Sequence, residues 1–149
     1  MYKLTNSEED LRLLEDYLKQ VDTDFLIPIS QKVVISVFAK KLLEFGHVVA
    51  IMEDNEIVAI VAYYRNDLQN NYAYLPILST LKKVRGRGYA RRMIEYMIDD
   101  CKGAGVKVIF CESVNPIAVK LYISCGFGIY ETVTDNVHNC LNRRLKLEL

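Results

Sequence analysis

Between a run rich in Leu and Ile and a segment with helical periodicity, the chain reads Val84-Arg85-Gly86-Arg87-Gly88-Tyr89-Ala90. The two glycines let the backbone approach an anion closely, because no Cβ intervenes. Free N–H groups at the start of the following helix point toward such an anion, and the helix dipole favours negative charge there. Six of the eleven residues from Lys82 to Arg92 are basic and can add charge-assisted hydrogen bonds. The stretch therefore predicts a pyrophosphate site.

Two common phosphate-binding motifs are excluded by the same residues. The pattern G-x-x-x-x-G-K-S/T of the P-loop is absent, and Arg91 stands where the third glycine of G-x-G-x-x-G would be. A surface turn with a solvated basic face is the alternative interpretation of this stretch.

The segments before this turn predict two helices and three strands. Ser7 resembles a helix N-cap, and apolar residues repeat at helical spacing over residues 11–21. A second helix is expected between Pro28 and Gly46. Five residues line its predicted buried face: Val34, Val37, Phe38, Leu42 and Phe45. Strands are expected over 47–53, 56–65 and 72–81, with a bulge or an edge near Pro76, because proline cannot donate to the ladder.

Helices and strands alternate after the turn. An apolar stripe of helical spacing runs from Ala90 to Cys101 and ends before Gly103 and Gly105. A short strand is predicted over 106–111, a helix over 116–124, a strand over 127–133 and an alternating strand to Leu149. Strands flanked by helices imply an α/β or α+β mixed sheet.

Composition narrows the function classes. The chain has 149 residues, of which 51% are hydrophobic, and no linker divides it, so one domain over residues 1–149 is expected. The formal net charge is zero, which argues against a general nucleic-acid binder. The N-terminus lacks an apolar signal segment, and the longest apolar run, 57–64, is too short to span a membrane. We expect a cytoplasmic protein with neither a nucleic-acid nor a membrane partner.

The four cysteines follow no metal or redox spacing. Each lies in an apolar segment, so all are expected to be small core residues in a reducing compartment. They are Cys101, Cys111, Cys125 and Cys140. No metal is expected.

Two segments of the chain resemble motifs of the GCN5-related N-acetyltransferases, the GNAT superfamily. Arg85-Gly86-Arg87-Gly88-Tyr89-Ala90 matches that family's loop Gln/Arg-x-x-Gly-x-Gly/Ala in full. Downstream, Asn115-Pro116-Ile117-Ala118-Val119-Lys120-Leu121-Tyr122-Ile123-Ser124-Cys125-Gly126-Phe127 is similar to Asn-x-x-Ala-x-x-Leu-Tyr-x-x-x-Gly-Phe. One helix and one strand separate the two motifs, as in the family. The resemblance implies a central, twisted, mostly antiparallel sheet with a splayed parallel pair, flanked by helices.

The resemblance also implies acetyl-CoA as cosubstrate and assigns residues to it. Leu78 and Thr80 would pair with the pantetheine arm, and the N–H of Leu78 would polarise the thioester carbonyl. Asn115 would contact the cofactor near that arm, although it could also cap a helix. Backbone N–H groups of six residues would hold the pyrophosphate: Arg85, Gly86, Arg87, Gly88, Tyr89 and Ala90.

By the same resemblance Tyr122 is the general acid, which protonates the departing thiolate. The base is less determined, because the strand 72–81 carries no carboxylate where many relatives have a Glu. Glu112 is the nearest substitute. His47, or a chain of waters ending at a carbonyl or at Tyr74, is the alternative.

The implied reaction is transfer of an acetyl group from acetyl-CoA to a primary amine by direct attack in a ternary complex. The acceptor could be a small molecule, a sugar amine or a peptide. Five tyrosines are possible walls of its site: Tyr63, Tyr64, Tyr72, Tyr74 and Tyr130. A catalytically silent CoA-binding or protein-interaction module of the same fold is the alternative, and an Arg-Gly contact to nucleic acid is the third. The apolar C-terminal strand could pair across a homodimer.

Overall fold

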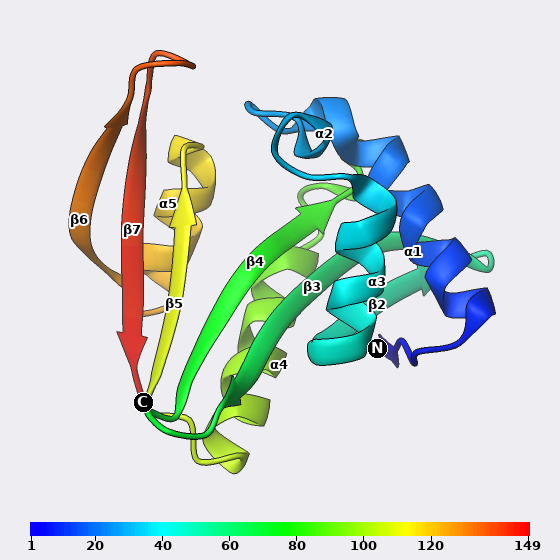
Figure 1. Cartoon of the computed structure of the whole chain (residues 1–149), viewed down its shortest axis with the longest axis horizontal. Helices are drawn as coiled ribbons and strands as arrows, with labels where there is room; N and C mark the ends of the chain where they lie inside the picture. Colours follow the sequence, from blue (N-terminus) through cyan, green and yellow to red (C-terminus); the bar gives the residue numbers. More distant parts are fainter.

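A single mixed sheet of seven strands organises the chain, and the computed structural model describes all 149 residues (Figure 1). The strands are β1 (Tyr2–Lys3), β2 (His47–Glu53), β3 (Glu56–Asp67), β4 (Tyr72–Thr80), β5 (Val108–Ser113), β6 (Gly128–Asp135) and β7 (Cys140–Glu148). They lie in the order β1-β2-β3-β4-β5-β7-β6, and β4–β5 is the parallel pair. This confirms the predicted mixed sheet.

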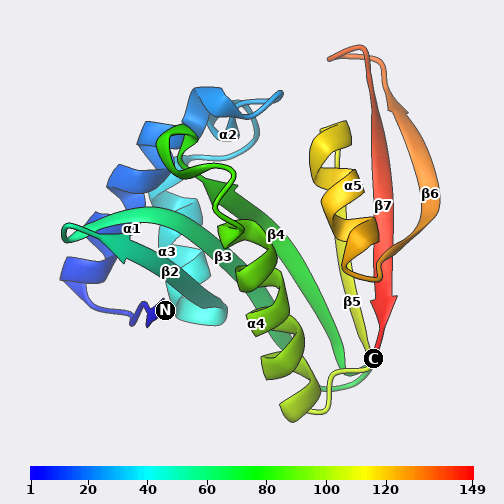
Figure 2. The ribbon, with the colours of Figure 1, turned by 180° about the vertical axis from the view of Figure 1, so that it is seen from behind.

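Five helices cover the two faces of the sheet. They are α1 (Glu8–Val21), α2 (Ile29–Lys32), α3 (Ile35–Phe45), α4 (Tyr89–Gly103) and α5 (Pro116–Ser124), with short 3-10 turns η1 (Asp22–Asp24) and η2 (Lys82–Val84). Helices α1 to α3 lie over the β2–β4 half of one face, and α4 and α5 lie on the opposite face (Figures 1 and 2). The first face is therefore uncovered over β5, β6 and β7. No helix has the length and apolar content needed to cross a lipid bilayer.

The parallel pair β4–β5 separates at Pro76. Pairing runs from Tyr72 opposite Val108 to Leu75 opposite Cys111 and then stops. On the other side of β4, Ala62 and Tyr64 of β3 lie opposite Ile77 and Tyr74, so β4 carries one extra residue between those pairs. Such a bulge bends the strand, and proline fits there because it has no N–H to donate. β4 and β5 then diverge (Figure 1), which confirms the expected splay.

Apolar stripes hold the helices to the sheet largely as their spacing predicts. Leu14, Leu18 and Val21 of α1 are fully buried, and so are Met93, Ile94, Met97 and Cys101 of α4. Full burial of each such side chain stabilises the fold by about 1.5–3 kcal/mol. Helix α1 thus packs on β3 from one face of the sheet, and α4 packs on β3 and β4 from the other.

The second predicted helix is two helices, and its predicted buried face is only partly right, because Leu42 is buried and Phe38 packs against the core, whereas the other three residues are exposed. Val33 and Val34 are extended and separate α2 from α3. Val34, Val37 and Phe45 are more than half exposed, at 65%, 64% and 53%. Apolar residues occupy a broad arc of α3, and Ser36, Lys40 and Glu44 lie along its exposed side. Within that arc the sheet buries the part that carries Ala39, Leu42 and Leu43.

Two smaller expectations also need correction. All four cysteines are free; Cys101 and Cys111 are buried as predicted, whereas Cys125 and Cys140 are only partly buried. The C-terminal strand β7 lies between β5 and β6, so it has no free edge with which to pair across a dimer. The edge strands are β6 and β1. The short strand β1 was not predicted from the sequence.

Candidate active site

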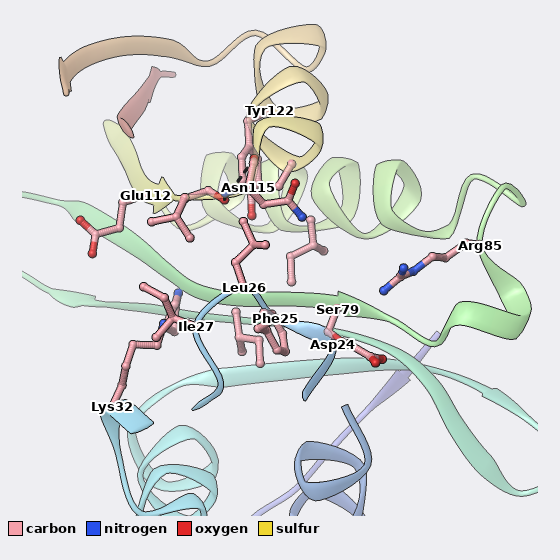
Figure 3. Close-up of a pocket in the computed structure, with 16 residues that line it drawn as sticks. Asp24, Phe25, Leu26, Ile27, Lys32, Ser79, Arg85, Glu112, Asn115 and Tyr122 are labelled. Carbon is pink, nitrogen blue, oxygen red and sulfur yellow. Dashed lines mark hydrogen bonds between the residues drawn. The ribbon is translucent and has the colours of Figure 1, made fainter. Parts of the chain in front are cut away.

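A cleft opens where β4 and β5 separate (Figure 3). Its walls come from β4 after the bulge, the end of β5, the first turns of α5 and the connection from η1 to α2. Four of the predicted site residues line it together, namely Leu78, Glu112, Asn115 and Tyr122, and Arg85 points into it (Figure 3). A second hollow adjoins the cleft at Arg85. It is lined by Thr80, Val84, Arg85, Gly86, Gly88, Tyr89, Ala90, Arg91 and Leu121.

The backbone of β4 leaves polar groups free along this cleft. The N–H of Leu81 donates to the carbonyl oxygen of Val58 at 2.8 Å. Hydrogen-bonded and non-hydrogen-bonded residues alternate along an antiparallel pair, so Ser79 and Ile77 also bond to β3. The N–H and C=O groups of Leu78 and Thr80 consequently face away from β3, toward the splayed side. The Thr80 carbonyl shows this directly, since it accepts from Nε of Arg85 at 3.4 Å.

The loop after β4 presents six consecutive N–H groups. None of the N–H groups from Gly86 to Arg91 has an acceptor in the protein, and the first bond of α4 runs from Arg92 to the carbonyl of Gly88 at 3.1 Å. The N–H of Arg85 donates to the carbonyl of Lys82 at 3.3 Å, so the run begins one residue later than expected and includes Arg91. Unsatisfied N–H groups at a helix start form an anion site.

Gly86 and Gly88 are needed for their backbone conformation, not because a larger side chain would clash with a neighbour. Their φ angles are 83° and 79°, and a Cβ built on either would meet no atom within 4 Å. Other residues adopt this left-handed region at a cost of roughly 1–2 kcal/mol. These two left-handed residues lie on either side of Arg87, immediately before α4 begins at Tyr89.

Only some of the six basic residues from Lys82 to Arg92 lack a carboxylate partner. Three side chains pair with carboxylates: Lys82 with Asp24 at 3.3 Å, Lys83 with Glu56 at 3.7 Å and Arg87 with Glu53 at 3.2 Å. Arg92 lies over the ring of Tyr89. Arg85 and Arg91 have no carboxylate partner, and both line the hollow. Arg91 also donates to Oγ of Ser124 at 2.7 Å, which joins α4 to α5.

Tyr122 is buried at the wall of the cleft. The residue is 6% exposed and packs against Phe127, with 5.6 Å between ring centroids, and its hydroxyl has no hydrogen-bond partner within the protein. Burial raises the pKa of this phenol well above its ordinary value, and Cys111 and Tyr74 add to the shift. The phenol is therefore protonated at neutral pH and can donate a proton into the cleft.

Asn115 caps α5. Its Oδ1 accepts from the N–H of Ile117 at 2.9 Å, and its own N–H donates to Oγ of Ser113 at 3.0 Å. The amide nitrogen of the side chain keeps its donors free in the cleft. The helix-cap interpretation of Asn115 is thus confirmed, and the cap leaves a group that could contact a ligand.

The three candidate bases lie in different places. Glu112 is at the outer end of the cleft and points away from Tyr122 (Figure 3), with its Oε2 3.4 Å from Nε of Arg144. His47 lines neither the cleft nor the hollow; it stacks on Tyr63. Burial and then Arg65 lower the pKa of His47. Burial, with a contribution from Glu112, raises the pKa of Tyr74 to about 12, which makes it a poor base at neutral pH.

An aromatic trough meets the cleft at Glu112, the one residue that lines both. Phe110 forms its centre, with Tyr72 at 5.1 Å and Tyr130 at 5.9 Å in edge-to-face contact. The trough lies on the sheet face that α1 to α3 leave uncovered. Its lining is Tyr64, Asn66, Asp67, Tyr72, Ala73, Tyr74, Phe110, Cys111, Glu112, Tyr130 and Arg144. Tyr63 is not part of it, because this tyrosine is buried and donates to Asp100 of α4 at 2.7 Å.

Several residues of the site carried no signal in the sequence. The segment Asp24–Ile27 forms one wall of the cleft. Ser79 lines the cleft and shares a 2.9 Å hydrogen bond with the hydroxyl of Tyr17, across 62 residues of sequence. Burial raises the pKa of Tyr17 to about 12. No group of three or more His, Cys, Asp or Glu side chains is placed to hold a metal ion.

Comparison with solved structures finds the same fold in proteins described as acetyltransferases. The GCN5-related N-acetyltransferase from Kribbella flavida superposes with a TM-score of 0.78 at 18% identity, covering 99% of this chain and 97% of that one. The ribosomal-protein-S18-alanine N-acetyltransferase from Escherichia coli gives 0.77 at 18% identity, with 99% and 92% covered. A Bacillus subtilis acetyltransferase in complex with CoA gives 0.63 at 17% identity, with 76% and 83% covered.

Comparison with curated protein sequences finds no significant match. The family model of the GNAT acetyltransferases, in contrast, matches residues 11–127. That range contains most of α1, the splayed strands, the loop with free N–H groups from Gly86 to Arg91 (the N–H-rich loop) and the whole of α5. The chain therefore belongs to the GNAT family of acetyltransferases.

Proposed function

We propose that the protein transfers the acetyl group of acetyl-CoA to a primary amine by direct attack within a ternary complex. The observation that carries this proposal is the run of six N–H groups without acceptors, placed beside the free backbone edge of β4. Such a run suits a pyrophosphate, and the exposed polar groups of Leu78 and Thr80 suit the amides of pantetheine. The CoA-bound Bacillus subtilis neighbour of the same fold supports this choice of cosubstrate.

The cleft supplies groups for each step of the transfer. The amine nitrogen attacks the thioester carbonyl, and negative charge develops on the carbonyl oxygen. The free N–H of Leu78 is the group proposed to stabilise that oxyanion. The C–S bond then breaks, and the Tyr122 hydroxyl gives its proton to the departing thiolate. Because the Tyr122 pKa is raised, this phenol is in its proton-donating form when the thiolate leaves.

Glu112 is the proposed base, acting on the ammonium form of the acceptor. Its position where the cleft meets the trough allows an amine to reach the thioester while the rest of the acceptor lies outside the cleft. The carboxylate points away from Tyr122, beside which the thioester would lie, so a water molecule would carry the proton from the acceptor's ammonium group to Glu112 (Figure 3). The acceptor can be a small molecule, a sugar amine or a peptide. Tyr64, Tyr72, Tyr74 and Tyr130 are the proposed walls.

Two observations favour the alternative of a catalytically silent module. Glu112 is engaged by Arg144, whose Nη1 also donates to Glu131 at 2.9 Å, and no carboxylate lies on β4. A chain that binds CoA and releases none with any amine would favour this alternative.

A thermal-shift titration followed by an amine panel tests the proposal. Ligand at about 100 times its Kd stabilises the native state by roughly 2.7 kcal/mol. We expect this shift with acetyl-CoA, and we expect release of CoA thiol with at least one amine class. No shift at millimolar acetyl-CoA would remove the cosubstrate from the proposal.

A further inference from the structure

We propose that Glu53 is a positioning residue for the cofactor loop. This inference rests on the proposed function, since it assumes that the loop binds the pyrophosphate of CoA. Glu53 is the last residue of β2 and lies 36 residues before Tyr89. It would not touch the cofactor. Its carboxylate would hold the loop in the conformation that presents the N–H groups from Gly86 to Arg91 before CoA binds.

The carboxylate of Glu53 binds the side chains of Arg87 and Tyr89, the two residues next to Gly88 in the chain. Oε2 of Glu53 accepts from the hydroxyl of Tyr89 at 2.5 Å and from Nη1 of Arg87 at 3.2 Å, and Oε1 lies 3.3 Å from the same Nη1. Arg87 stands between the two left-handed glycines, and Tyr89 is the first residue of α4. With the side chains on both sides of Gly88 held, the flexible glycine backbone between them loses most of its freedom.

The other end of this contact is rigid. Glu53 precedes a two-residue turn in which Asp54 and Asn55 have φ angles of 52° and 63°, and Glu53 lies opposite Glu56 across the hairpin. Two left-handed residues in a two-residue connection define a tight turn whose twist matches that of its strands. Glu53 therefore reaches the loop from a tightly held hairpin.

The charges favour the same interpretation. The hydrogen bond from Tyr89 and the charge of Arg87 hold the pKa of Glu53 below its usual range, so this carboxylate is ionised at neutral pH. Its partner Arg87 lines neither the cleft nor the hollow. Arg87 would thus act on the loop's shape, and Arg85 and Arg91 would supply the charge that meets the phosphates. A loop already in its bound shape binds more tightly because less ordering accompanies binding.

The test measures CoA binding by calorimetry, so it needs no acceptor. Glu53→Gln should raise the Kd for CoA about five- to tenfold, while circular dichroism shows a folded chain. The loss should be the same for 3′-dephospho-CoA, because both ligands carry the pyrophosphate. The matched control is Glu56→Gln. It removes the same charge from the same hairpin but contacts only Lys83, and its Kd should stay within twofold of wild type.

A double-mutant cycle separates positioning from general stability. Tyr89→Phe removes the phenol that donates to Glu53, so Glu53→Gln combined with Tyr89→Phe should be less damaging than the product of the single effects. Glu53→Asp should recover part of the affinity. Unchanged or tighter CoA binding in Glu53→Gln, an equal loss in Glu56→Gln, or a loss confined to CoA and absent with 3′-dephospho-CoA would overturn the inference. A wild-type chain that binds no CoA would overturn the proposed function, and this inference with it.

Discussion

Nε of Arg85 lies 3.4 Å from the carbonyl oxygen of Thr80, so one side chain connects the N–H-rich loop to the free edge of β4. Arg85 lines both the cleft and the hollow and has no carboxylate partner. A ligand that occupies both spaces passes this guanidinium. The hydrogen bond from Arg85 to Thr80 is long and its acceptor is a neutral carbonyl. A phosphate oxygen that replaced this carbonyl would form a stronger, charge-assisted hydrogen bond with Arg85.

We therefore expect Arg85→Gln to weaken CoA binding. A hydrogen bond to a charged group contributes about 1.5–3 kcal/mol, which corresponds to a Kd raised by roughly ten- to a hundredfold. Arg12→Gln, which removes the same charge from an exposed position of α1, is the control and should leave the Kd unchanged. Calorimetry with CoA measures both. Equal affinities of the two variants would contradict a phosphate role for Arg85.

Gly88→Ala should destabilise the chain without a steric clash. The φ angle of 79° is strained for alanine, by roughly 1–2 kcal/mol, although no atom lies within 4 Å of the added Cβ. We expect a Tm lower by about 2–8 °C in thermal unfolding. Gly103→Ala is the matched control, because that glycine also has open space around its Cβ but lies within α4 and has no positive φ. Its Tm should not fall.

Tyr122→Phe should lower kcat and leave the Kd for acetyl-CoA within about twofold. Proton donation by a positioned side chain contributes about 10²–10⁴-fold, so we expect a loss of at least roughly 100-fold in turnover. Because the Tyr122 pKa is raised, the acid form persists above the usual titration range of tyrosine, and the wild-type rate should show no fall from this group up to about pH 10. A Tyr122→Phe turnover equal to that of wild type at every pH would remove the acid role.

Asp100 should make stability depend on acid pH. Burial raises its pKa, but hydrogen bonds from Tyr63 at 2.7 Å and Arg65 at 3.0 Å outweigh burial, so the folded-state pKa is lowered. A lowered folded pKa means that the stabilisation is present above the unfolded pKa and is lost as the pH falls through the folded one. Asp100→Asn should therefore lower the free energy of unfolding at pH 7 and flatten its decline in acid, as urea titrations at several pH values would show. The same decline in wild type and Asp100→Asn would contradict this assignment.

The elements that were predictable are those with a local signal. The N–H-rich loop follows from Gly86 and Gly88 next to a helix, and the bulge in β4 follows from Pro76, because both depend on backbone properties of single residues. The splay of β4 and β5 was expected only from the resemblance to the family. The buried face of α3 was only partly predictable, since its apolar arc is broad and the break at the extended Val33 and Val34 left no local signal.

Contacts between segments far apart in the sequence could not be predicted, for a different reason. The bond between Tyr17 and Ser79, and the hold of Glu53 on Arg87 and Tyr89, join residues separated by 34 to 62 positions. Nothing in either partner's neighbours indicates the other. The same limit explains why Arg87, which the motif assigns to a phosphate loop, proves to have its charge engaged by the β2–β3 hairpin.

The aromatic trough predicts where the acceptor's substituent lies. Tyr130 is partly exposed and meets Phe110 edge to face, and the trough reaches the cleft only through Glu112. Once the amine panel has given an acceptor, Tyr130→Ala should raise its KM about five- to tenfold, because a packed aromatic wall is lost. The KM for acetyl-CoA should be unchanged, since Tyr130 lines neither the cleft nor the hollow. Tyr96→Ala removes a partly exposed tyrosine from α4, so it is the control and should leave both constants as in wild type. An acceptor KM that is the same in both variants would contradict the role of Tyr130 as a wall of the acceptor site.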